Sequence, residues 1–278
     1  MAIAAMIYDF DRTLSPKDMQ EYSFIPHIGM DAPAFWAECQ AFAKQHKADR
    51  ILAYMYKMLE KTPLTRNTLM ELGREIEYFP GVTDWFQRIN AFGKSLGIEV
   101  EHYIISSGLR EIIEGTSIAH EFKEIFAAFF VYDEQGRAVW PAAAVNYTSK
   151  TQFLFRINKG ILDVTEDQAL NEYTPDERRR IPFSHMIYIG DGLTDVPCMK
   201  LVKRSGGISI GVYQESAAIV DDMLFNGRVD FVLSADYRSG SPLEQTVRAA
   251  LMGIAAQSQL NDKHIAPLDQ ARRRAQRL

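Results

Sequence analysis

The chain has 278 residues, of which 47% are hydrophobic and 24% charged, with a formal net charge of −5 at pH 7. This is the composition of a globular protein with ample material for a large core, and the acidic balance gives no reason to expect a nucleic-acid partner. No apolar run reaches membrane-spanning length, so no membrane partner is expected, and two cysteines without a CxxC motif do not suggest a disulfide framework.

The first predicted element is an apolar strand over residues 3–8. It has no basic region before it and no small-residue cleavage site after it, so it does not indicate a signal peptide, and we expect a cytoplasmic protein. Asp9 and Asp11 follow the strand at once. Such carboxylates repel one another, and taken alone they are compatible either with a turn or with a site of chemistry.

The next segment, residues 16–79, shows helical patterns and no strand. One stripe has the spacing of a buried helix face and consists of Ile51, Tyr54, Met55, Met58 and Leu59. A weaker stripe consists of Leu69, Leu72 and Ile76. We interpret both stripes as helix-on-helix packing, and residues 16–79 as a helical domain inserted after the first strand.

The remainder of the chain alternates strands with helices. Short continuous apolar runs, typical of strands buried on both faces, cover residues 100–105, 186–189, 207–212 and 229–233. Helical spacing connects them, and residues 129–137 indicate a strand, a turn and a strand. This alternation predicts an α/β fold, a doubly wound and mostly parallel sheet built from residues 1–15 and 80–278.

Polar clusters follow three of the predicted strands, at the ends where such sheets bind ligands. Two clusters supply the carboxylates of Asp9, Asp11, Asp191 and Asp195. Each aspartate alone could be a turn former or a helix N-cap, but carboxylates converging on one cleft need a cation to neutralise them. Ligation by oxygen alone favours a hard ion, and we expect Mg²⁺.

The third cluster is Ser106-Ser107-Gly108. Its hydroxyl groups and backbone N–H groups could hold a phosphate, or a serine could simply cap the helix that follows. Lys150 begins a later helical pattern, where a cation opposes the helix dipole. This position favours a functional role more than it would for a lysine elsewhere, although a solvated surface lysine is the commonest explanation of such a residue.

These residues resemble the motifs of the haloacid dehalogenase-like (HAD) superfamily. The stretch DFDRTL at residues 9–14 is similar to its first motif, and GDGLTD at residues 190–195 is similar to its fourth. Ser106 is similar to the second motif and Lys150 to the third. The motifs occur in family order and span about two thirds of the chain.

The resemblance implies a Rossmann-like core and a mechanism. Asp9 would attack phosphorus to form an aspartyl-phosphate, and Asp11 would protonate the leaving oxygen and then deprotonate water. Ser106 and Lys150 would bind phosphate oxygens. Thr13 would orient the loop.

The same resemblance implies how Mg²⁺ would be held. Asp9 and Asp191 would be direct ligands, Asp11 would contribute its backbone carbonyl, and Asp195 would act directly or through water.

Asp11 also indicates the branch of the family, because family dehalogenases lack an acidic residue at that position. The helical insertion stands where type C1 caps occur, and with Ser106-Ser107-Gly108 the chain looks most like the phosphoserine phosphatase-like branch. Two departures are Ser107, where the branch usually has glycine, and the long segment between Lys150 and Asp191. That length makes Lys159 a rival for the third-motif role.

We therefore predict a Mg²⁺-dependent phosphatase that acts on a small organic phosphate monoester. The alternatives are phosphoryl transfer to an acceptor other than water, and a catalytically idle binding protein on the same scaffold. The sequence does not indicate the substrate or the oligomeric state. The candidates for substrate selection in the cap are Lys17, Glu21, Tyr22, His27 and Arg50.

Overall fold

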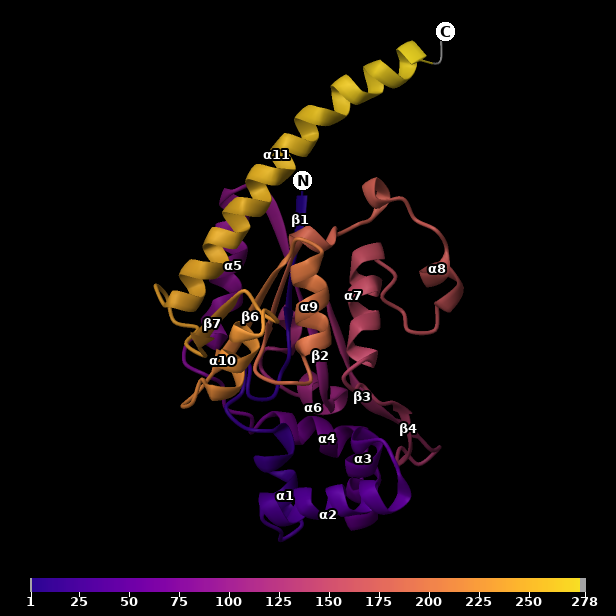
Figure 1. Cartoon of the computed structure of the whole chain (residues 1–278). Coiled ribbons are helices and arrows are strands. Elements are labelled where there is room, and N and C mark those ends of the chain that lie inside the picture. Colours follow the sequence, from indigo (N-terminus) through magenta and orange to yellow (C-terminus); the bar gives the residue numbers. More distant parts are fainter. Residues whose placement is uncertain (1, 276–278) are drawn as a thin grey trace.

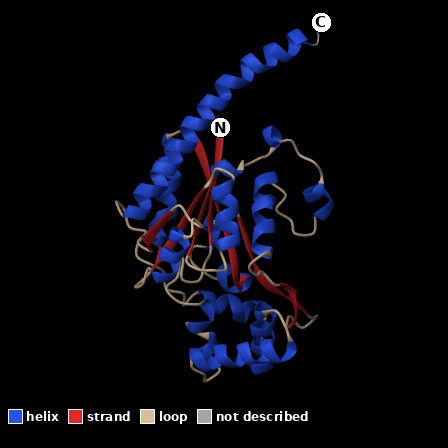
Figure 2. Cartoon of the chain, viewed as in Figure 1, coloured by secondary structure: helices blue, strands red, loops and turns tan. Residues whose placement is uncertain are grey.

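The structure, a computed structural model, describes residues 2–275 and is built on a seven-stranded sheet with helices on both faces (Figures 1 and 2). The strand order is β4-β3-β2-β1-β5-β6-β7, and every adjacent pair is parallel except β3 and β4. This confirms the predicted doubly wound α/β fold. The strands are β1 (Ala2–Tyr8), β2 (Ile98–Leu109), β3 (Glu124–Tyr132), β4 (Ala138–Ala143), β5 (Met186–Gly190), β6 (Ile208–Tyr213) and β7 (Phe231–Ser234).

An apolar layer covers each face of the sheet, so the side chains of the central strand β1 are buried on both faces. Ala4, Met6 and Tyr8 pack into one layer, and Ala5 and Ile7 pack into the other. The first layer contains α5 (Val82–Ser95), α6 (Arg110–Glu114) and α11 (Pro242–Ala275). The second contains α7 (Ser149–Lys159), α9 (Val196–Arg204) and α10 (Ala218–Phe225), while α8 (Asp167–Asn171) lies in the long segment after α7.

The helices of the insertion lie beyond the carboxyl end of β1 (Figure 1). After a 3-10 turn at Met19–Glu21 they are α1 (Phe24–His27), α2 (Ala32–His46), α3 (Arg50–Lys61) and α4 (Arg66–Gly73). Aspartate side chains cap the two long helices: Asp31 accepts from the N–H of Ala34, and Asp49 accepts from the N–H of Ile51. The predicted domain limits at residues 16 and 79 stay a prediction.

The second helical stripe was only partly right. Leu69 and Leu72 lie in α4, but the helix ends at Gly73 and Ile76 lies beyond it, buried in the following turn. The helix packs closely on α6 of the core: a side chain at Gly73 would lie 2.1 Å from the carbonyl oxygen of Ile112. This close approach fixes where α4 lies.

The predicted strand–turn–strand after the second strand is confirmed as the antiparallel pair β3 and β4. It reaches toward the insertion, because the N–H of Ala138 donates to the carbonyl of Leu64 at 2.8 Å, beside an isolated bridge between Thr65 and Arg137. Figure 1 shows β4 beside α3. The core therefore holds the insertion from a second side.

In the described part of the chain, no helix combines the length and the hydropathy needed to cross a membrane.

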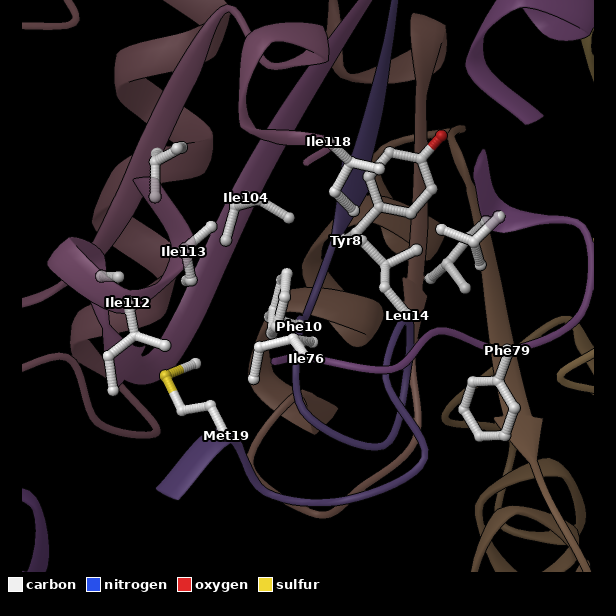
Figure 3. Close-up of a cluster of buried hydrophobic side chains, with 14 of the residues drawn as sticks. Tyr8, Phe10, Leu14, Met19, Ile76, Phe79, Ile104, Ile112, Ile113 and Ile118 are labelled. Atoms are coloured by element: carbon white, nitrogen blue, oxygen red, sulfur yellow. The ribbon is translucent and has the colours of Figure 1, made fainter. Parts of the chain in front are cut away.

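A buried polar network lies directly behind the end of β1. The indole N–H of Trp85 donates to the hydroxyl of Tyr8 at 2.9 Å, and that hydroxyl lies 2.9 Å from Nδ1 of His102. Nε2 of His102 lies 2.9 Å from Oδ1 of Asn90. Each donor meets an acceptor if His102 is neutral and protonated on Nε2, and burial lowers the pKa of His102 to about 3. Figure 3 shows Tyr8 among the apolar side chains that surround it.

We expect His102 to make the folded state acid-sensitive. Its pKa is lowered on folding, so the unfolded chain binds a proton first, near pH 6.5. The contribution of neutral His102 to the free energy of unfolding is complete above that pH. It falls as the pH drops toward about 3, by up to about 1.4 kcal/mol per pH unit. Urea unfolding should show the wild type losing about 2 kcal/mol more than His102→Gln between about pH 7.5 and 5. Equal losses in the two proteins would contradict this assignment.

Candidate active site

The predicted site residues meet at the carboxyl ends of three adjacent strands. Asp9 follows β1, Ser106 lies near the end of β2, and Asp191 follows β5. The strand β1 lies between the other two, with Tyr8 paired to Ile104 and to Ile189. The connections reverse direction across this point of the sheet, which is where open α/β sheets bind their ligands.

The loop after β1 alternates between core and cavity. Phe10 and Leu14 are fully buried in the apolar layer (Figure 3), whereas Asp9 and Asp11 line a cavity. The chain turns at Arg12, whose φ of 57° is left-handed and whose guanidinium pairs with Asp18 at 2.9 Å. The two carboxylates therefore face the same space because the residues between and after them are anchored.

Asp11 is held by the first turn of the insertion. The N–H of Met19 donates to Oδ1 of Asp11 at 2.8 Å. A side chain at Gly108 would lie 2.1 Å from the methyl group of Met19 and 3.1 Å from Oδ2 of Asp11, so a larger residue there would displace the side chain of Met19 and crowd Asp11. Burial, with the charges of Asp18 and Asp9, raises the pKa of Asp11 well above its usual range.

Lys150 lies at the centre of the carboxylate cluster. Its Nζ is fully buried and donates to Oδ2 of Asp9 at 2.8 Å and to Oδ1 of Asp195 at 2.7 Å. Burial alone would lower the pKa of Lys150, but the carboxylates of Asp195 and Asp9 outweigh it and raise the pKa. Lys159 lies elsewhere: its ammonium donates to the carbonyls of Leu170 and Glu172. The structure thus brings Lys150 to the cluster and leaves its rival outside.

Asp195 stands behind the cluster. Its Oδ1 accepts from Lys150 and from the hydroxyl of Tyr188 at 2.7 Å, and its side chain is fully buried. Gly190 makes room for it, since a side chain there would lie 2.6 Å from Oδ2 of Asp195. Helix α9 begins only after Asp195, so the turn over residues 192–195, rather than a shared helix face, brings Asp191 and Asp195 together.

The carboxylates suit a hard cation. Oxygens of Asp9, Asp191 and Asp195 lie within 4.8 Å of one another. Burial, then the charges of Asp195 and Asp9, raise the pKa of Asp191 well above its usual range, and burial with the charge of Asp9 raises the pKa of Asp195 to about 6. A divalent ion would relieve this repulsion. Asp9 and Asp191 line the cavity, whereas Asp195 does not.

The structure contradicts one of the two interpretations of Ser106-Ser107-Gly108, namely that a serine caps the following helix. Helix α6 begins at Arg110 with Leu109 before it and no side-chain cap, so no serine caps it. Instead, the N–H of Gly108 donates to Oγ of Ser106 at 3.0 Å. Ser107 lines the cavity, and its Oγ is buried with no hydrogen-bond partner among the described residues. An unpartnered hydroxyl beside the carboxylates is suited to a ligand oxygen.

The cavity has a volume of about 680 Å³ and lies between the sheet end and the insertion. Of the five cap candidates, Arg50 alone lines it. Sequence reasoning missed the rest of the wall, because its residues show no motif, and Tyr54 was counted only as a packing residue. The missed residues include Gln20, Trp36, Asp49, Tyr54, Asn146 and Tyr147.

A hydrogen bond across this cavity joins the insertion to the helix that carries Lys150. Nδ2 of Asn146 donates to Oδ2 of Asp49 at 2.6 Å, while Oδ1 of Asp49 caps α3. The carbonyl of Asn146 accepts the N–H of Lys150 at 2.9 Å. The start of α3 and the start of α7 are thus fixed to each other.

The family profile of haloacid dehalogenase-like hydrolases matches residues 6–200, a span that contains all four motifs. The chain belongs to the HAD family. This HAD protein is also 26% identical, over 274 residues, to an uncharacterized protein of Borreliella burgdorferi, covering 87% of this chain and 94% of that protein.

Solved structures share the fold. A probable phosphoserine phosphatase from Vibrio cholerae has a TM-score of 0.56 at 12% identity, covering 92% of this chain and 67% of that one. A HAD family hydrolase from Salmonella enterica serovar Typhi has a TM-score of 0.54 at 16% identity, and the match covers 82% of this chain and 66% of that one. A phosphoserine phosphatase in a phospho-aspartyl intermediate analogue state has a TM-score of 0.52 at 13% identity, and the match covers 90% of this chain and 99% of that one.

This HAD chain therefore spans about two thirds of the length of the Salmonella and Vibrio structures, and nearly all of the third. Family membership confirms the prediction of a hydrolase.

We expect Lys150→Met to destabilise the protein strongly, because it leaves the buried carboxylates of Asp9 and Asp195 without their cation. Removing one member of a buried ion pair costs about 3–5 kcal/mol. The matched control, Lys159→Met, loses hydrogen bonds to two carbonyls and should cost about 1–2 kcal/mol. Urea unfolding without divalent ions measures both, and equal losses would contradict the central place of Lys150.

Proposed function

We propose that the protein is a Mg²⁺-dependent phosphatase that hydrolyses a small organic phosphate monoester through a phosphoryl group carried on Asp9. The observation that supports this most directly is the pair of carboxylates at Asp9 and Asp11 facing one cavity, with Lys150 buried against the first. The family assignment and the phosphatases of similar fold agree with it.

Asp9 is suited to be the nucleophile. Its Oδ1 accepts the N–H of Phe10 at 2.7 Å and its Oδ2 accepts Lys150, so the carboxylate is fixed while it borders the cavity. An oxygen of Asp9 would bond to phosphorus as the bond from phosphorus to the alcohol oxygen breaks. The ammonium of Lys150 holds this carboxylate in its orientation.

Asp11 is placed to move the proton. It borders the same cavity two residues later, with one oxygen fixed by Met19 and the other beside Gly108. Asp11 would give its proton to the departing alcohol oxygen. It would then take a proton from the water that attacks the phosphoryl group on Asp9, which releases inorganic phosphate, frees the carboxylate of Asp9 and leaves Asp11 protonated again.

The remaining core residues would hold the phosphate and the ion. Asp9 and Asp191 would bind Mg²⁺ on the cavity side, and the ion would supply charge neutralisation between the nucleophile and the anionic substrate. Asp195 would keep Lys150 in place behind them. The hydroxyl of Ser107, with that of Ser106, would donate to phosphate oxygens, while Gly108 would hold Ser106 through its N–H.

We expect Asp9→Asn to lower kcat for phosphate ester hydrolysis by on the order of 10³-fold or more, because the amide is not a nucleophile. The matched control is Asp84→Asn, on an exposed position of α5, which should keep full activity. Hydrolysis is measured as inorganic phosphate released.

Chelation of divalent ions should abolish the same activity, and added Mg²⁺ should restore it. Full activity in Asp9→Asn would remove the assigned nucleophile, and a rate unchanged by chelation would remove the metal.

A further inference from the structure

The inference concerns the part of the substrate that is not phosphate, and it rests on the proposed phosphatase activity. We propose that the alcohol portion of the substrate carries a planar ring whose edge both donates and accepts hydrogen bonds, as heterocyclic bases do. The cap wall of the cavity combines fixed aromatic surface with an amide that has no hydrogen-bond partner among the described residues.

The aromatic wall is formed by Trp36 of α2 and Tyr54 of α3. Their rings form an edge-to-face pair with centroids 6.0 Å apart and planes at 80°. The indole N–H of Trp36 donates to Glu21 at 2.9 Å, and the hydroxyl of Tyr54 donates to the carbonyl of Ser107 at 2.7 Å. Both polar atoms are already bound within the protein, so these side chains offer the cavity ring surface, which favours another ring.

The amide belongs to Gln20, in the 3-10 turn next to Met19. This side chain is only 2% exposed and lines the cavity. Within the described residues its amide makes no hydrogen bond, and neither amide atom is fully enclosed by protein, so both can be reached from the cavity. A glutamine amide presents a donor beside an acceptor, so it matches a ring edge that presents the complementary pair.

The size of the cavity agrees with a ring. Its volume of about 680 Å³ is in the range of pockets that enclose a ligand of drug size. An ester such as ethyl phosphate would occupy the carboxylate end and leave Trp36 and Tyr54 in contact with water. Ring burial against these two side chains would contribute affinity that a small ester cannot obtain.

Two substrate pairs with matched leaving alcohols test the inference. Nucleoside 5′-monophosphates are compared with ribose 5-phosphate, and 2-phenylethyl phosphate is compared with ethyl phosphate. We expect kcat/KM to favour the ring-bearing member of each pair by about tenfold or more, which is about 1.4 kcal/mol. The leaving alcohols are alike within a pair, so the ratio reports the ring.

Two variants separate the ring from its edge. Trp36→Leu should lower kcat/KM about tenfold for both ring-bearing esters and leave the ring-free esters within about twofold. Gln20→Leu should lower kcat/KM about tenfold for the nucleotides alone, because 2-phenylethyl phosphate has no polar edge to lose. The controls are Trp140→Leu and Gln87→Leu, both exposed and outside the cavity.

Equal or better turnover of the ring-free esters would overturn the inference, as would Trp36→Leu lowering both members of a pair equally. If Gln20→Leu left the ratio of kcat/KM between the nucleotides and ribose 5-phosphate unchanged, the proposed hydrogen bonds to the edge of the ring would be wrong. The Asp9→Asn protein gives an independent readout, since calorimetry should rank the ligands in the same order without turnover. If the wild type with Mg²⁺ hydrolysed none of these esters, the proposed function would fail, and the calorimetric ranking would still decide this inference.

Discussion

The ammonium of Lys150, buried between the carboxylates of Asp9 and Asp195, is the interaction on which the site depends. It joins the ends of β1 and β5 to the start of α7, three segments that are far apart in the sequence. Removing these charges from water is unfavourable unless they are paired with good geometry. The short contacts, with Tyr188 as a further donor to Asp195, supply that pairing.

The surrounding backbone is shaped to permit this cluster. Gly190 and Gly108 leave space where a side chain would collide with Asp195 in one case and with Met19 in the other. The hydrogen bond from Asn146 to Asp49 fixes the start of α7 relative to the cap. The carboxylates, the ammonium that anchors them and the wall of the cavity are therefore parts of one connected structure, although they come from different segments.

The sequence predicted the core well because its signals there are local. Short apolar runs ending in Asp9 or Asp191 mark buried parallel strands, and the order of the motifs identified the carboxylates and Lys150. Errors arose where tertiary contacts decide. The helical stripe extended to Ile76, but α4 ends at Gly73, where the chain lies close against the backbone of Ile112. Trp36 and Gln20 could not be predicted, because a cavity wall assembled from separate cap elements has no periodicity of its own.

The central claim is a phosphoryl group carried on Asp9, and trapping it is the most direct measurement. The Asp11→Asn protein should be mixed with Mg²⁺ and an aryl phosphate, whose leaving oxygen needs no proton, and then quenched in acid. Phosphorylation of Asp9 can then proceed while its hydrolysis lacks a base. The account predicts one phosphoryl group, found by mass spectrometry on the peptide that contains Asp9. Turnover by this protein with no phosphoryl group on Asp9, or with one on another residue, would contradict it.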